Sequence, residues 1–248
     1  MFELTTQNIG TLLLDGSTIF LLIGVLMLST IMRKRGRQDD KLFFLLVIEN
    51  MVIAVADIIT YLADGKDFPG ARFLNMFGVS VFYLVMIMLC MTWEQYATVR
   101  FKRSSMKLSK RRKLSFIPGI VMQFILVVNF FVSYVFYRDD SNRFNGLVFA
   151  VDRSNGYHYG ILFVPMFLVM GFYMVVGFVL VAKYRTGSNK TLIPVWIYFI
   201  PLAVGLIVPF VFGGLSLTSI GIAMSMMFTH LGSASEITET VPEGGESA

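Results

Sequence analysis

Three polar residues that could do chemistry lie inside one apolar run, LFFLLVIENMVIAVADIITYLAD, which begins at Leu42. They are Glu49, Asn50 and Asp57, and no Lys or Arg lies inside any apolar run of similar length in the chain. Ionisable groups at membrane depth are energetically costly and tend to mark functional sites. Three states are therefore open for the two acids: they are protonated and hydrogen-bonded, they face water, or they meet a cation or a cationic ligand.

The spacing of these residues along a helix separates their roles. Asn50 and Asp57 are seven residues apart, so they share a helix face, and Tyr61 follows one turn later on the same side. With a rise of ~1.5 Å per residue, Glu49 falls in the inner third of a membrane span and Asp57 in the outer third. Asp57 is then either a ligand-binding group or a protonated, hydrogen-bonded packing residue.

Glu49 belongs with Glu94 to an inner layer of acids, close to basic loops. We expect a structural role for both, because long side chains at this depth can reach the inner surface or an ion-pair partner. The candidate partners are Arg33, Arg35 and Arg100.

The outer half of the predicted spans collects a second set of polar and aromatic side chains. Asp15 and Ser219, together with Asn75 and Tyr83, lie at about the depth of Asp57. Such a set would line a polar-aromatic chamber open to the outside. The predicted ligand-binding residues are Asp57, Tyr61, Asn129, Tyr134, Phe149, Tyr157 and Tyr159.

Long apolar segments must position these residues, and the composition agrees with this. Of the 248 residues, 56% are hydrophobic and 15% are charged, whereas a soluble domain carries about 25% charged residues. The pattern predicts an all-α membrane protein, a bundle of seven transmembrane helices of about 20 residues each. The predicted spans are 11–32, 42–63, 73–98, 114–137, 159–182, 191–212 and 215–231.

The distribution of basic residues predicts the orientation of the bundle. Sixteen of the 21 Lys and Arg lie in the loops after the first, third and fifth spans, and the other five lie on the opposite side. By the positive-inside rule, the N-terminus lies outside and the C-terminus in the cytoplasm. We therefore expect a multi-pass protein of a bacterial inner (cytoplasmic) membrane. The net charge of +5 does not indicate nucleic-acid binding, because the basic residues alternate with hydrophobic runs.

Two features outside the spans complete the predicted architecture. Between the fourth and fifth spans, LVFAVDRSNGYHYG reads as two strands around an Asn155-Gly156 turn, a short β-hairpin over the outer mouth. The acidic segment 232–248 is predicted to be a disordered cytoplasmic tail, which leaves 1–231 as the transmembrane domain. Within the sixth span, three prolines interrupt the backbone hydrogen bonds and are either hinges or static kinks. They are Pro194, Pro201 and Pro209.

No sequence motif indicates catalysis or a cofactor. The chain has no HExxH, no GxSxG, no Walker A sequence and no GxGxxG after a strand. The two histidines, His158 and His230, are predicted at opposite ends of the bundle, which disfavours a metal site. The last span has no lysine that could form a retinal Schiff base. We therefore expect a protein that is not an enzyme.

Four of these features together resemble one family. They are the second span with its acids, the aromatic end of the third span (MTWEQYATVRF), the hairpin, and the Pro-rich sixth span before a short seventh span that ends in SMMFTHL. This combination resembles the seven-helix N-terminal sensor module that many gut-associated Gram-positive bacteria place ahead of diguanylate cyclase (GGDEF) or sensor histidine kinase domains.

The resemblance covers roughly residues 8–231 and implies an extracytoplasmic sensing bundle that passes a signal along its seventh helix. The family pattern carries over to Asp57 in the second span. In the hairpin it carries over to Phe149, Asp152, Gly156, Tyr157 and Gly160. Where the family continues into an output domain, this chain has only the acidic tail, so either the signal goes to a separate cytoplasmic partner, or this is a degenerate module with another use.

Three functional hypotheses follow. The first is a sensor or receptor-like protein in the lipid bilayer, which binds a small extracellular ligand near Asp57 and signals to a cytoplasmic partner. The second is a small transporter or ion-coupled carrier, because carboxylates in two layers could form a proton or cation path. The third is an interaction or assembly subunit, which would dock a partner through its basic inner loops.

Overall fold

The computed structural model describes residues 6–32, 38–63, 66, 68–101, 114–136, 149–152, 156–159, 163–184, 200–205 and 217–238. These residues form six helices of at least 20 residues, a two-stranded sheet and a short helical segment at 200–205. The helices are α1 (Thr6–Met32), α2 (Gln38–Ala63), α3 (Ala71–Phe101), α5 (Ile117–Phe136), α6 (Phe163–Tyr184) and α8 (Thr218–Thr238). The strands are β1 (Phe149–Asp152) and β2 (Gly156–Tyr159).

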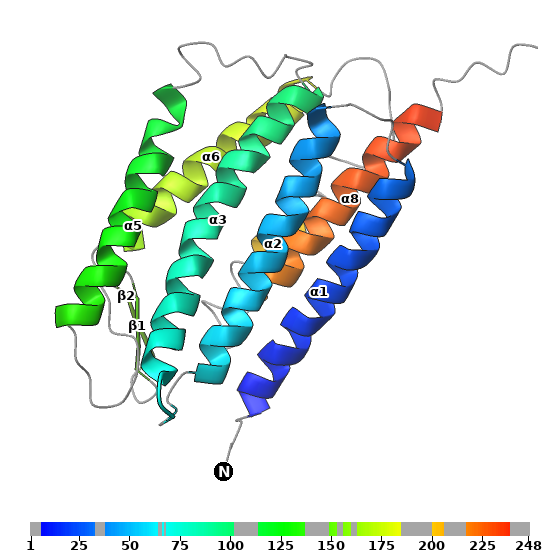
Figure 1. The fold of residues 1–248 in the computed structure, drawn as a ribbon. Helices are drawn as coiled ribbons and strands as arrows, with labels where there is room; N and C mark the ends of the chain where they lie inside the picture. Colours follow the sequence, from blue (N-terminus) through cyan, green and yellow to red (C-terminus); the bar gives the residue numbers. More distant parts are fainter. Residues whose placement is uncertain are drawn as a thin grey trace, which may run out of the picture.

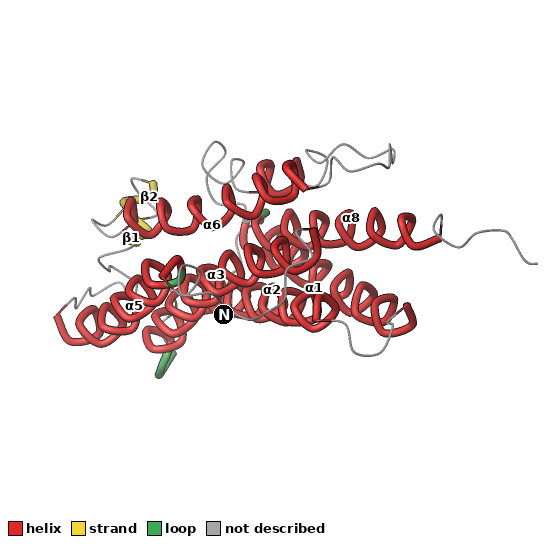
Figure 2. Tube along the Cα trace, turned by 90° about the horizontal axis from the view of Figure 1, so that it is seen from above, coloured by secondary structure: helices red, strands yellow, loops and turns green. Residues whose placement is uncertain are grey.

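The helices lie in two layers. Figure 1 shows α5, α3, α2 and α1 side by side, and in Figure 2, seen from above, α6 and α8 form a second layer over them. In this second layer α6 packs against α3 and α5, and α8 packs against α1 and α2. Consequently α3 lies between α2 and α5, and no described segment of α5 lies next to α1.

Four of the helices are long and apolar enough to cross a membrane. Their apolar stretches are Ile9–Thr30, Asp39–Ala63, Phe73–Arg100 and Val164–Lys183, and α5 and α8 contain the shorter apolar stretches Ile117–Phe131 and Thr218–Phe228. This length and hydropathy indicate a membrane protein of helical type.

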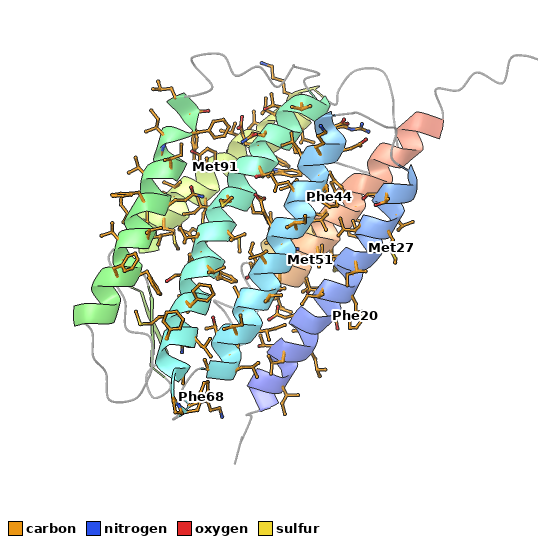
Figure 3. The ribbon with its side chains drawn as sticks, in the orientation of Figure 1. Phe20, Met27, Phe44, Met51, Phe68 and Met91 are labelled. Atoms are coloured by element: carbon orange, nitrogen blue, oxygen red, sulfur yellow. The ribbon has the colours of Figure 1, made fainter. Side chains whose placement is uncertain are left out.

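Large apolar side chains cover the outside of the bundle as well as filling its core. Phe20 and Met27 on α1 are 79% and 65% exposed and point away from the other helices, as Figure 3 shows. Asp15 on the same helix is fully buried. An apolar exterior around buried polar side chains is the arrangement that a lipid environment favours.

A buried tyrosine joins the layers at one end of the bundle. The hydroxyl of Tyr173 on α6 donates to the carbonyl oxygen of Ser115 at 2.8 Å, and it accepts the backbone N–H of Gly119 at 3.0 Å. Ser115 and Gly119 flank the start of α5. Because the first N–H groups of a helix have no partner within the helix, this hydroxyl acts as a cap supplied by a neighbour.

An ion pair ties the end of α3 to the start of α2. Arg100 Nη1 lies 2.8 Å from Asp39 Oδ2, and both side chains are largely buried. The expectation that Arg100 pairs with Glu49 or Glu94 is therefore replaced by this pairing with Asp39. Asp39 also stands in the first turn of α2, where a negative charge interacts favourably with the helix dipole.

Six of the seven predicted helical segments are helices, and several boundaries differ from prediction: α1 and α2, for example, begin five and four residues before their predicted spans. The fifth segment begins at Phe163 and not at 159, because β2 pairs antiparallel with β1 through Tyr159, the partner of Phe149. The seventh continues to Thr238, so the prediction of disorder is wrong for 232–238. One glycine (Gly232) costs a helix only about 1 kcal/mol, which is insufficient to end one that is already formed.

Other predictions fall on residues outside the described part of the chain. The sixth predicted span, 191–212, is described only at 200–205, which is helical and contains Pro201. Pro194 and Pro209 lie outside the described residues, as does 239–248 of the predicted tail.

Candidate functional site

Four buried polar residues from three helices meet where α8 begins, between the middle of α2 and its C-terminal part and beside the first half of α1. We call Asp15, Asn50, Asp57 and Ser219 the three-helix cluster. Asp15 and Asn50 are fully buried, Ser219 is 1% exposed and Asp57 is 8% exposed. Side chains of this polarity are rarely buried unless they are paired.

Ser219 connects the other two helices. Its hydroxyl Oγ donates to Asp15 Oδ1 on α1 in a short hydrogen bond. Its backbone carbonyl oxygen accepts a hydrogen bond from Asn50 Nδ2 on α2 at 3.1 Å. One residue at the start of α8 is thus bonded to α1 through its side chain and to α2 through its backbone.

The carboxyl groups of Asp15 and Asp57 face each other across α1 and α2. The two groups are close enough that the charge of one affects the other. An ionised carboxylate only accepts hydrogen bonds, so contact between two carboxyl groups favours a proton on one of them. Two ionised groups close together would repel each other strongly inside a bundle of low dielectric. Such a pair therefore favours a proton or another positive charge beside it.

The cluster also contains more acceptors than donors. Among the described residues, neither Asp15 Oδ2 nor Asn50 Oδ1 has a donor within hydrogen-bonding distance. The great majority of buried polar atoms in proteins have a partner, so each exception calls for a chemical explanation. An excess of buried oxygen acceptors is the arrangement that binds protons and small cations.

The second acid of α2 lies in a different environment. Glu49, eight residues before Asp57, accepts a hydrogen bond at Oε1 from Thr92 Oγ1 on α3 at 2.9 Å. Its other oxygen, Oε2, is buried and has no donor among the described residues. Glu94 is also buried, and Thr98 Oγ1 donates to its Oε1 at 3.3 Å. Glu49 thus joins α2 to α3, and the three-helix cluster joins α2 to α1 and α8.

The predicted ligand-binding residues do not form one group in this arrangement. Asp57 lies in the three-helix cluster, and Tyr61 follows one turn later on α2, half-buried. Asn129 is buried on α5, and α3 separates that helix from α2 (Figure 1). The remaining four predicted residues, Tyr134, Phe149, Tyr157 and Tyr159, have described backbones, but their side chains lie outside the described part.

Three members of the cluster, Asp15, Asn50 and Ser219, are absent from the predicted ligand set. Counting depth from the ends of the apolar runs places Asp15 and Ser219 at the level of Asp57, which is the signal that could have selected these two. The spacing within one helix carries no information about which neighbouring helix packs on that face. Asn50 is correctly predicted on the face of Asp57, since both reach α1 or α8.

The remaining predictions about sites concern metals and hinges. No group of three or more His, Cys, Asp or Glu side chains that could hold a metal ion occurs within the described residues. Pro201 lies in the segment 200–205, and its carbonyl oxygen would be 2.5 Å from a Cβ placed at Gly221 of α8. The segment that carries Pro201 therefore packs closely on the helix that carries Ser219.

Comparisons of the chain with protein-family models, with curated proteins and with solved structures give no match. The resemblance to the seven-helix sensor module therefore stays a prediction, and the function is argued from the geometry of the three-helix cluster.

Proposed function

We propose that this chain is a non-enzymatic sensor of a bacterial cell membrane, which binds a small extracellular ligand and signals through a separate partner. In this proposal the bundle has seven spans, the N-terminus is outside and the C-terminus is cytoplasmic. The three-helix cluster then lies in the outer half of the membrane, close to the extracellular side.

The observation that carries this proposal is the double connection of Ser219 to Asp15 and Asn50. A ligand that changes the distance or the charge state of Asp15 and Asp57 changes the bonds that hold the start of α8. A conformational change requires that the ligand favour one of two arrangements of the same contacts. Removal or gain of a single hydrogen bond to Ser219 is such a difference.

The length of α8 supports its role as the output element. Its apolar stretch ends at Phe228, and the helix continues for ten more residues to Thr238. At ~1.5 Å per residue, this extension carries the helix about 15 Å further. A rigid helix that begins at a polar cluster and ends beyond the apolar layer can transmit a rotation or a shift across the membrane.

The proposal is tested by thermal-shift screening of the full chain in nanodiscs, in sodium-free choline buffer. The probes are a panel of small amines, amino acids and carboxylic acids. We expect at least one compound to raise the melting temperature of the wild type but not that of Asp57→Asn. Glu49→Gln is the matched control, because it neutralises a buried acid of α2 that lies outside the cluster and bonds Thr92 of α3.

A ligand that stabilises all three proteins equally would show that the cluster is not its site. An ion-coupled carrier is the second candidate, favoured by the contact between the two carboxyl groups of Asp15 and Asp57. In proteoliposomes, a current driven by a pH gradient that is lost in Asp57→Asn would replace the sensor by a carrier.

A further inference from the structure

We propose that the three-helix cluster is a binding site for a small monovalent cation, Na⁺, held by the buried oxygens of Asp15, Asp57, Ser219 and Asn50 in competition with protons. The proposal goes beyond the sensor function, because it concerns the resting occupant of the cluster and not the extracellular ligand. It rests on the types of atom that meet there, their burial and their bonding.

The atoms that meet in the cluster are oxygens from three helices. Asp15 and Asp57 bring two carboxyl groups together, and Ser219 contributes the hydroxyl that touches Asp15. Carboxylate, hydroxyl and carbonyl oxygens are the ligands that hard cations prefer. With one proton or one Na⁺ between them, the two carboxyl groups no longer repel each other.

A second observation, independent of the acids, is the side chain of Asn50. It is fully buried, and its Nδ2 is held by the carbonyl oxygen of Ser219, the residue whose hydroxyl contacts Asp15. Its Oδ1 is buried and has no donor among the described residues. A buried amide oxygen without a donor is a neutral oxygen ligand of the kind that hard cations accept.

The number and burial of these oxygens favour a monovalent ion over a divalent one. Ca²⁺ takes roughly 6–8 oxygen ligands, and Mg²⁺ usually keeps several coordinated water molecules. The cluster offers the side chains of four residues, of which three are at most 1% exposed. An ion that enters it must lose most of its hydration shell, which is far less costly for Na⁺ than for Mg²⁺.

The exchange is balanced: Na⁺ enters as a proton leaves, so Na⁺ and H⁺ compete for the same oxygens. Among the described side chains of α1, α2, α3 and α8, the titratable groups at this level are Asp15, Asp57, Tyr61 and Tyr83. Glu49 lies two turns further along α2, on Thr92 of α3. Competition between Na⁺ and protons therefore belongs to the pair of aspartates.

The test is thermal unfolding of the full chain in nanodiscs, with NaCl titrated against choline chloride at constant ionic strength and no organic ligand. We expect the melting temperature to rise with Na⁺ concentration until it saturates. Below the pH at which the pair binds a proton, each further fall of one pH unit should raise the half-saturating Na⁺ concentration about tenfold, because protons compete for the same oxygens. KCl is expected to act more weakly at equal concentration.

Three variants separate the site from general salt effects. Asp15→Asn and Asp57→Asn are expected to abolish the Na⁺ response, and Glu49→Gln is expected to keep it. Ser219→Ala keeps both carboxyl groups and is expected to bind Na⁺ with a lower affinity, which provides a second readout if an aspartate variant does not fold.

Each outcome decides the matter. A melting temperature that depends on pH but equally on Na⁺ and choline means that the pair holds only a proton, and the proposal is wrong. A Na⁺ response that persists in both Asp15→Asn and Asp57→Asn overturns it as well. Neither result depends on whether the ligand screen finds an extracellular ligand, so the two proposals can fail separately.

Discussion

At the scale of single residues, Ser219 is distinctive because it is hydrogen-bonded to two other helices. It is 1% exposed, its hydroxyl bonds Asp15 on α1, and its carbonyl oxygen bonds Asn50 on α2. A serine within an ordinary helix usually returns its hydroxyl to its own backbone, as Ser17 does to the carbonyl oxygen of Leu13 at 2.7 Å. The hydroxyl of Ser219 instead donates a hydrogen bond to a residue of a neighbouring helix, so its side chain contributes to tertiary structure.

Replacement of Ser219 by alanine removes the described donor to Asp15 Oδ1. We expect the free energy of unfolding to fall by about 1–3 kcal/mol, the range for a buried polar group left without its partner. Thermal unfolding in nanodiscs, followed by tryptophan fluorescence, measures the change. Ser17→Ala is the control, since the Ser17 hydroxyl is exposed and bonds only its own helix. An equal loss in both variants would show that the bond to Asp15 contributes nothing.

Residue types and depths can be predicted from the sequence, but contacts between helices cannot. The period of the helix correctly places Asn50 on the face of Asp57, because that face depends only on backbone geometry. The residue that faces Asp57 from a neighbouring helix cannot be predicted in this way. Nothing in the apolar pattern of α2 distinguishes a neighbour that carries Asp15 from one that carries Asn129. The predicted ligand set therefore combines residues from opposite sides of α3.

At the scale of elements, the closest approach that involves α8 is to the segment 200–205. A Cβ at Gly221 would lie 2.5 Å from the carbonyl oxygen of Pro201 and 3.1 Å from Gly205 Cα. The reverse is also true, since a Cβ at Gly205 would lie 2.6 Å from the carbonyl oxygen of Leu217. Two glycines that face each other allow two helical backbones to touch, as in many membrane helix pairs.

Alanine at Gly221 should separate these two backbones. The atom it meets belongs to the main chain, so the clash cannot be relieved by a side-chain rotation. We expect a loss of stability of about 1–3 kcal/mol, typical of overpacking. Gly171→Ala on α6 is the matched control, because a Cβ there meets nothing within 4 Å. Helix propensity alone would make that control more stable by up to about 1 kcal/mol. Equal stability of the two variants in thermal unfolding would contradict the close packing.

Elements are predicted well where hydropathy decides and less well where two structures compete. The helices α1, α2 and α3 follow from apolar runs, but flanking residues outside those runs extend them by up to five residues. The start of α6 differs from the predicted one because Tyr157 and Tyr159 favour a strand as well as an apolar helix. Both residues pair with β1 in the antiparallel sheet. The end of α8 differs because polar composition alone does not end a helix.

At the scale of the whole molecule, the predicted orientation rests on basic residues that lie between the predicted spans. Two exposed residues mark the two ends of the bundle. Pro69 precedes α3, on the side predicted to be outside, and Lys183 lies at the end of α6, on the side predicted to be cytoplasmic. The only cysteine of the chain, Cys90, is buried, so it adds no background to thiol labelling.

Labelling of intact cells with a membrane-impermeant maleimide tests this orientation. We expect Pro69→Cys to react in intact cells and Lys183→Cys to react only after the membrane is permeabilised. The unmodified chain, with buried Cys90, is the control for background. The opposite pattern of labelling would invert the bundle and place the three-helix cluster at the cytoplasmic side.

The layered arrangement itself is beyond the reach of the sequence. Apolar composition predicts that helices associate within a membrane, but lipid chains are as apolar as leucine, so hydropathy does not determine which helices are neighbours. In this bundle the neighbours correspond to polar and small-residue contacts. Glu49 with Thr92 joins α2 to α3, and Ser219 joins α8 to α1 and α2.

The hydroxyl of Tyr173 has a mechanical consequence for the other half of the molecule. It holds both the carbonyl oxygen of Ser115 and the N–H of Gly119, so a single oxygen atom on α6 fixes the axial position of the first turn of α5. The two helices cannot slide past each other at that end without the loss of two hydrogen bonds. Relative motion of α5 and α6 is therefore restricted to pivoting about this oxygen, with the largest displacement at the end where β1 and β2 lie (Figure 1).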